Sequence, residues 1–266
     1  MTLKLYHSTE STCSQKVRFV MATKNLQWEQ VNLNLRKGEQ FTKEYLALNP
    51  KAVVPTLLHN NSVIRESTVI IEYLDDVFPT PPMKPAAALD RANMRLLLKA
   101  FDEEVHPAVG ILSYAIVLRH QMNRLYTADE LAQHFQKIVD PGRRQRQQGT
   151  HAEGLRSAAS ANAYRSLEGV TRLMERSLEG REWLAGDCFS LLDACAAPYM
   201  MRIGNIGLSA LWGEHESVTR WLEKVTAQVE SLGLDEPWGS DSFHSMVAGY
   251  VQGSQAEISA FLDATG

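Results

Sequence analysis

The sequence predicts two domains, an α/β N-terminal domain with the element order βαβαββα and an all-α helical-bundle C-terminal domain. Segments with strand and helix periodicity alternate over the first eighty residues, which is typical of an α/β domain. Four prolines then fall between residues 79 and 85, where a helix cannot continue, and helical patterns alone follow them. We therefore expect a domain at residues 1–80, a proline-rich linker at 81–87 and a helical domain at 88–266.

The elements of the first domain follow from the spacing of their apolar residues. In TLKLY, Leu3 and Leu5 alternate with polar neighbours, which predicts a strand at residues 2–6. The next elements are predicted in the same way. They are a helix at 14–24, a strand at 29–35, a helix after the N-cap Thr42, two strands around an Asn60-Asn61 turn, and a helix at 66–78.

The helical domain begins with one long pattern. Residues 90–120 have helical spacing throughout, with an expected bend near Pro107. Two later helices begin with capping boxes, in which a hydroxyl residue and an acidic residue three positions on satisfy each other's backbone N–H groups. These pairs are Thr127 with Glu130 and Ser190 with Asp193. The basic, glutamine-rich run GRRQRQQG at 142–149 is interpreted as a solvated helix end or loop.

Composition limits the classes of partner. A net charge of −4 and a pI near 6.1 argue against nucleic acid and anionic membranes as partners. The start MTLKLYHS lacks the pattern of a signal peptide, and no apolar run approaches the roughly 20 residues that cross a bilayer. We therefore expect a cytoplasmic protein without a membrane partner.

The cysteines and histidines indicate neither a disulfide framework nor a metal site. Three cysteines are too few for such a framework and suit a reducing compartment. Cys188 and Cys195 flank a helix start and are interpreted as small buried hydrophobic residues. The eight histidines show no metal-ligand spacing, so no metal is expected.

Three motifs carry a family resemblance. The element NPKAVVPTLL followed by ESTVIIEYL closely resembles the glutathione-binding core of cytosolic glutathione transferases, and WLAGDCFSLLDACAAP resembles the C-terminal folding motif of that family. The opening MTLKLY and the extra segment at 126–149 resemble the branch that contains bacterial β-aryl-ether-cleaving enzymes. The resemblance implies a thioredoxin-like N-terminal domain, glutathione as co-substrate and a homodimer.

The resemblance also implies where glutathione binds. At a helix start, Ser67 suits the γ-glutamyl carboxylate and Glu66 the ammonium, although Ser67 alone is equally consistent with an N-cap. Val54 would precede a cis proline, Pro55, and offer its backbone to the cysteinyl part, the alternative being an edge-strand proline. Gln40 fits the glycyl carboxylate. Lys43 could add charge there or be solvated.

The thiolate is the reactive form of glutathione, so its pKa must fall from about 8.5. Hydroxyls and N–H groups at the first helix start would stabilise it. Ser11 takes the catalytic position in one alignment and Ser14 in another, with Thr12 and Cys13 beside them. Cys13 lies outside the position of the nucleophile in Cys-type relatives, so a neighbouring role is favoured over nucleophilic attack.

The resemblance implies a glutathione transferase acting on a small hydrophobic, aromatic electrophile, with β-aryl ether cleavage as one form. The electrophile would lie against a loop and the long helix. The candidate contacts are Ser8, Thr9, Glu10, His106 and Tyr114. The alternatives are a glutathione-dependent isomerase, a disulfide or dehydroascorbate reductase using Cys13, and a non-catalytic glutathione-binding module.

Overall fold

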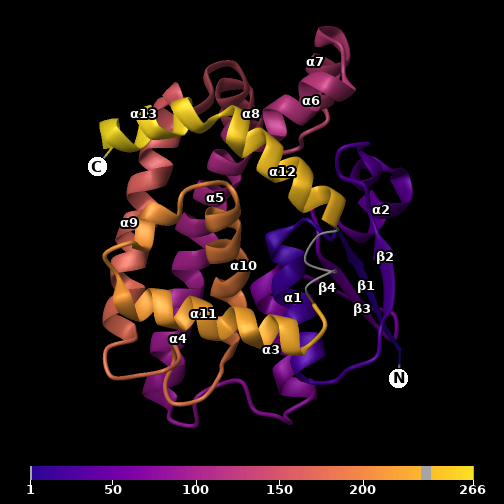
Figure 1. Ribbon diagram of the computed structural model, residues 1–266. Helices are drawn as coiled ribbons and strands as arrows, with labels where there is room; N and C mark the ends of the chain where they lie inside the picture. The colour runs from indigo at the N-terminus through magenta and orange to yellow at the C-terminus, as the bar shows by residue number, and fades with distance from the viewer. Residues whose placement is uncertain (1, 235–240, 266) are drawn as a thin grey trace.

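The computed structural model describes residues 2–234 and 241–265, and its first layer is a four-stranded sheet (Figure 1). The strand order is β2-β1-β3-β4, with β1 parallel to β2 and antiparallel to β3, and β3 antiparallel to β4. The strands are β1 (Leu3–His7), β2 (Glu29–Asn32), β3 (Thr56–His59) and β4 (Ser62–Arg65). The predicted Asn60-Asn61 turn joins the last two strands, and Asn60 adopts a φ of 51° there.

Helices complete the βαβαββα order, which confirms the predicted N-terminal architecture. They are α1 (Thr12–Thr23), the short η1 (Glu39–Phe41), α2 (Lys43–Leu48) and α3 (Ser67–Val77). The predicted strand at 29–35 is too long, because β2 ends at Asn32. There the Asn34 N–H donates to the Glu39 carboxylate at 2.7 Å, which turns the chain out of the sheet.

Alternating apolar residues of the sheet pack against apolar stripes of α1 and α3. Leu5 and Leu57 from the strands, Val17 from α1 and Ile70 from α3 are all completely buried. This burial is the main source of stability for the layer, at roughly 1.5–3 kcal/mol for each large side chain. The opposite side of α1 packs against α10 of the helical region, so α1 lies between the two layers.

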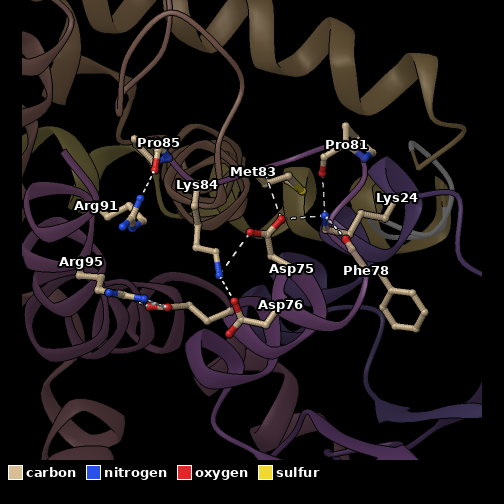
Figure 2. A network of polar contacts seen from close by, with 11 residues as sticks. Lys24, Asp75, Asp76, Phe78, Pro81, Met83, Lys84, Pro85, Arg91 and Arg95 are labelled. Atoms are coloured by element: carbon tan, nitrogen blue, oxygen red, sulfur yellow. Dashed lines mark hydrogen bonds and ion pairs between the residues drawn. The ribbon is translucent and has the colours of Figure 1, made fainter. Parts of the chain in front are cut away.

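The proline-rich segment after α3 is held by a buried lysine (Figure 2). Lys24, at the end of α1, donates to the carbonyls of Phe78 and Pro81 at 2.7 Å each and pairs with Asp75 at 2.7 Å. Asp75 also accepts the Met83 N–H at 3.0 Å. A proline-rich segment has few backbone N–H groups, so its carbonyls lack their usual partners within the segment. The Lys24 ammonium donates to these carbonyls instead.

The long helical pattern forms one continuous run of helical segments. It comprises α4 (Ala88–Ala100), η2 (Phe101–Val105), α5 (His106–Ser113), η3 (Tyr114–Leu118) and α6 (Arg119–Leu125), in which η2 and η3 are π-type turns. The widened turn η2 ends next to His106 and Pro107, where the sequence predicted a bend. Pro107 has no N–H to donate, and the wider turn accommodates that missing hydrogen bond.

The remaining helices surround this run. They are α7 (Ala128–Gln136), α8 (Pro141–Glu153), the short η4 (Gly154–Arg156), α9 (Ala158–Ser177), α10 (Leu191–Asn205), the short η5 (Ser209–Trp212), α11 (Glu216–Ser231), α12 (Asp241–Gly253) and α13 (Gln255–Thr265). Both predicted capping boxes are confirmed, at the starts of α7 and α10. Within the described residues, no helix is long and apolar enough to cross a membrane.

Two predictions for this region are wrong. The run 142–149 is neither a loop nor a helix end, because Asp140 caps α8 through the Arg143 N–H and Pro141 occupies the first turn, which starts a full helix. Cys188 is exposed, whereas Cys195 is buried as predicted. Cys188 lies before the first turn of α10, outside its packed face, so helical spacing did not apply to it.

Candidate active site

The start of α1 places the two serine candidates in different environments. Ser11 is the N-cap, and its hydroxyl oxygen accepts the Ser14 N–H at 3.3 Å. Ser14 is fully buried, and its hydroxyl oxygen accepts the Ser8 N–H at 3.3 Å. Ser11 and Thr12 are partly exposed, so the Ser11 O–H remains able to donate to a bound group. The geometry therefore favours Ser11 over Ser14 as a ligand for a thiolate.

The loop before α1 is fixed from several sides. The Thr9 carbonyl accepts hydrogen bonds from Gln15 at 3.0 Å and from Arg18 at 3.2 Å. The Glu10 carbonyl accepts from Arg202 of α10 at 2.7 Å. A loop held by both layers offers a rigid wall beside the α1 N-terminus.

The start of α3 has the features of an anion site. Glu66, the residue before the helix, has a φ of 64°, a costly conformation for a residue other than glycine. Ser67 follows as the first helical residue, and its hydroxyl has no hydrogen-bond partner among the residues described. The Glu66 carboxylate pairs with Lys51 at 2.7 Å in an exposed position, where such a pair contributes little stability. An incoming ammonium could therefore replace Lys51.

The other residues that the resemblance assigned to glutathione have mixed surroundings. The Val54–Pro55 bond is cis, as the resemblance implied. Gln40 is buried, and its side-chain N–H donates to the Leu35 carbonyl at 3.2 Å, whereas its side-chain oxygen has no partner within the part of the chain described. Lys43 begins α2 and is exposed. Among the described residues, Gln40 thus has an unpaired acceptor oxygen, and the Lys43 ammonium has no ion-pair partner.

The structure brings Cys13 together with two residues of the helical layer. The Cys13 sulfur lies 3.4 Å from Nδ1 of His106 and 3.4 Å from the hydroxyl of Tyr199. Burial would raise the pKa of the Cys13 thiol, but the charges and hydrogen bonds of His106, Lys16 and Tyr199 outweigh it and lower that pKa to about 6. The Cys13 charge in turn raises the pKa of His106, against the effect of burial.

A buried lysine extends this group. The Lys16 ammonium donates to the Thr68 hydroxyl at 2.9 Å and to the Asp102 carboxylate at 3.1 Å, and it lies 5.6 Å from the centre of the Tyr199 ring. Burial disfavours its charge, yet its electrostatic interactions with Cys195, Cys13 and Asp102 raise its pKa overall. Lys16 thus joins α1, α3 and η2 and keeps a positive charge beside Cys13.

Sequence reasoning missed Tyr199 and Asp102, and it grouped His106 with Tyr114. The phenol of Tyr114 instead meets His151 of α8 at 3.1 Å, inside a small core formed with α6 and α7. Tyr199 lies on a helix whose other buried residues are mostly small or aliphatic. A phenol in such a helix is the one signal that could have singled it out.

Comparisons with known proteins point to one family. The family model described as glutathione S-transferase, N-terminal domain, matches residues 5–82. Protein LigF of Sphingobium sp. strain SYK-6 is 30% identical over 197 residues, which are 73% of this chain and 76% of that protein. Glutathione S-transferase Z1 of Arabidopsis thaliana is 41% identical over 90 residues, which are 34% of this chain and 41% of that protein.

Solved structures agree with the sequence matches. The crystal structure of the β-etherase LigF from Sphingobium sp. strain SYK-6 has a TM-score of 0.77 and 25% identity, covering 88% of this chain and 99% of that one. Glutathione transferase F7 of Populus trichocarpa has a TM-score of 0.68 and 20% identity, covering 90% and 100%, and shows the fold alone.

Proposed function

Since the chain belongs to the glutathione S-transferase family, we propose that it is a transferase that binds glutathione and directs its thiolate to an electrophilic carbon. The observation that carries this proposal is the start of α3. Glu66 has a strained backbone, and the Ser67 hydroxyl has no hydrogen-bond partner among the described residues. Both lie at the N-terminal end of α3, which favours anions. This arrangement suits an amino acid head group, which carries a carboxylate and an ammonium.

With the amino acid head group placed at the start of α3, the positions of the remaining parts of glutathione follow. The γ-glutamyl carboxylate meets Ser67, and the ammonium replaces Lys51 at Glu66. The cysteinyl backbone pairs with Val54, and the second N–H of the Gln40 side-chain amide, whose first donates to the Leu35 carbonyl, donates to the glycyl carboxylate. The sulfur then lies at the α1 N-terminus, where the Ser11 O–H donates to the thiolate and the helix dipole stabilises its charge.

The electrophile class is the finer part of the proposal. We infer a β-aryl ether whose reacting carbon lies beside an aryl ketone. The thiolate forms a carbon–sulfur bond as the carbon–oxygen bond breaks, and the phenolate leaves with the bonding electrons. Support comes from the similarity to LigF along most of both chains, and from the rigid Ser8–Glu10 loop beside α1. The protein contributes a lowered thiol pKa and the relative position of the two reactants.

Calorimetry of glutathione binding to the wild type and to the Glu66→Ala/Ser67→Ala double variant tests the site. Losing charged hydrogen bonds of about 1.5–3 kcal/mol each predicts a loss of affinity of tenfold or more. Ser62→Ala, on exposed β4, is the matched control and should bind like the wild type. Equal affinity in the double variant and the control would refute the assignment.

The role of Ser11 is tested by the ultraviolet absorbance of the glutathione thiolate across pH. The titration of the free protein is subtracted, because Cys13 also ionises. Ser11→Ala should retain binding and return the pKa of the bound thiol toward about 8.5. If Ser14→Ala has this effect and Ser11→Ala does not, the roles of the two serines are reversed.

We also propose a homodimer that buries an apolar surface on α3 and α4. Val69 is 55% exposed, Leu96 67% and Leu89 73%, which are large values for apolar side chains. A salt bridge of 2.6 Å between Glu72 and Arg95 joins the two helices beside them. Sedimentation should give twice the chain mass of 29.8 kDa.

A further inference from the structure

The loop that carries Gln40 is shaped by hydrogen bonds between its own residues. This loop, the β2–α2 loop, comprises residues 34–41 and includes η1. The Glu39 carboxylate accepts the Asn34 N–H at 2.7 Å, which closes the loop on itself. One N–H of the Gln40 side-chain amide donates to the Leu35 carbonyl at 3.2 Å. The direction of the second N–H therefore depends on where the loop holds the Leu35 peptide.

Tyr126, the first residue of the extra segment, holds the loop at the neighbouring peptide. Its phenolic O–H donates to the carbonyl of Arg36, which follows Leu35 in the chain. Tyr126 is itself fixed where two helices meet. Its N–H donates to the Met122 carbonyl at 3.0 Å at the end of α6, and Thr127 caps α7 immediately after it. A phenol fixed in this way can set the position of the loop.

A cluster of aromatic rings holds the other end of the loop. The ring of Phe41, the residue after Gln40, lies edge-on to His134 of α7, with centroids 5.8 Å apart. His134 also packs against Tyr126 at 5.3 Å, and Figure 1 shows α7 and α2 on the same side of the molecule. A hollow of about 400 Å³, lined by Phe41 and Val139 among others, adjoins the cluster. Packing is not continuous there, so the contact depends mainly on these rings.

The brace matters for binding because a hydrogen bond depends on direction. A bond to a carboxylate weakens steeply as its angle departs from linear, so the Gln40 amide must already point at the ligand. A loop that is free to move loses conformational entropy when the ligand orders it, and that loss weakens binding. Tyr126 and His134 restrict the loop on both sides of Gln40 before any ligand arrives.

We propose that Tyr126 and His134 are positioning residues for the glycyl end of glutathione, and that they make the protein select glutathione over γ-glutamylcysteine, the thiol that lacks the glycine. The inference rests on the proposed function, because it uses the Gln40 contact assigned there. Each of the two residues acts through the β2–α2 loop and not by contact with the ligand. The extra segment thereby contributes to the choice of thiol.

The first test is calorimetry of both thiols with the wild type and two variants. The wild type should bind glutathione about tenfold or more tightly than γ-glutamylcysteine, because the glycyl carboxylate adds a charged hydrogen bond. Tyr126→Phe removes only the hydroxyl. It should weaken glutathione binding by about threefold to tenfold and γ-glutamylcysteine binding by less than about twofold. His134→Ala, which removes the ring beside Phe41, should act in the same direction.

A double-mutant cycle tests whether Tyr126 acts through Gln40. Gln40→Ala alone should remove most of the preference for glutathione. Adding Tyr126→Phe to Gln40→Ala should then weaken glutathione binding by less than about twofold more, because the amide that Tyr126 positions is absent. Equal losses from Tyr126→Phe with and without Gln40 would show that the two residues are independent and would overturn the inference.

The matched control is Tyr164→Phe, which removes a phenolic hydroxyl from a buried tyrosine of α9 that packs against Phe261 of α13. It should bind both thiols like the wild type. Thermal unfolding of every variant shows whether a loss of affinity reflects a loss of fold.

The outcomes separate this inference from the proposed function. If Tyr126→Phe weakens both thiols equally, or changes neither, the inference is overturned and the proposed function stands. The same holds if the wild type binds the two thiols with equal affinity. A wild type that binds no glutathione removes both the proposed function and the inference.

Discussion

Replacing Asp193 with Ala should destabilise the protein strongly, because one buried carboxylate satisfies donors from three segments. Its Oδ1 accepts the Leu184 N–H and the Trp221 indole N–H at 2.9 Å each. Its Oδ2 accepts the Ser190 N–H at 2.9 Å and the Ser190 hydroxyl at 2.6 Å. Asp193 is completely buried, so water cannot replace these bonds without entering the core.

The size of the destabilisation follows from the hydrogen-bond donors that lose their acceptor when Asp193 is removed. Each buried donor without a partner costs about 1–3 kcal/mol, while removing a buried carboxylate recovers part of its desolvation. Burial raises the pKa of Asp193 despite its hydrogen bonds, which shows that this desolvation is substantial. With three N–H groups stranded, the net loss is about 3–5 kcal/mol. For a chain of this length that loss lowers Tm by roughly 6–10 °C.

The assay is thermal unfolding followed by circular dichroism, with urea unfolding as a second measurement of the free energy. Asp187→Ala is the matched control, since Asp187 lies exposed in the loop just before α10. It should unfold within about 1 °C of the wild type, as surface substitutions usually do. Trp221→Phe should give an intermediate loss, because it removes one donor and keeps the carboxylate. A Tm for Asp193→Ala equal to that of Asp187→Ala would refute the reasoning.

Two further predictions concern assembly and pH. Leu96→Glu places a charge on the apolar surface of α3 and α4, so sedimentation should show a monomer; an unchanged dimer would exclude this surface. Burial, and then the charge of Arg18, lower the pKa of His7 from 6.5 to about 4, so the folded state resists protonation. The unfolded chain takes up that proton, so stability should fall by up to about 3 kcal/mol as pH drops through that interval. The measured loss should shrink in His7→Leu, and an identical acid dependence in both proteins would contradict this assignment.

Much of the fold was predictable because its elements are fixed by local interactions. Apolar spacing located the strands and most of the helices, and the capping boxes at Thr127 and Ser190 located two helix starts. The end of β2 and the helical state of 142–149 were mispredicted. In both places a side chain close in sequence, Glu39 or Asp140, settled the outcome through a hydrogen bond that apolar periodicity does not register.

In the candidate site too, some features have local sequence signals, whereas others depend on tertiary packing. The sequence alone determined that hydroxyl residues begin α1 and that Glu66 and Ser67 begin α3, because helix starts have local signatures. Only the tertiary structure distinguishes the environments of Ser11 and Ser14, since burial depends on what packs over each hydroxyl. It also decided the surroundings of Cys13.

His106 is 93 positions from Cys13 and Tyr199 is 186 positions away, so no local pattern relates the three residues. They meet because apolar faces of α1, α5 and α10 pack together, and that packing is directed by burial and not by the polar groups it joins. A cysteine that the sequence made a neighbour of the reacting thiol therefore acquires, in the folded chain, the charges that would make it a thiolate itself.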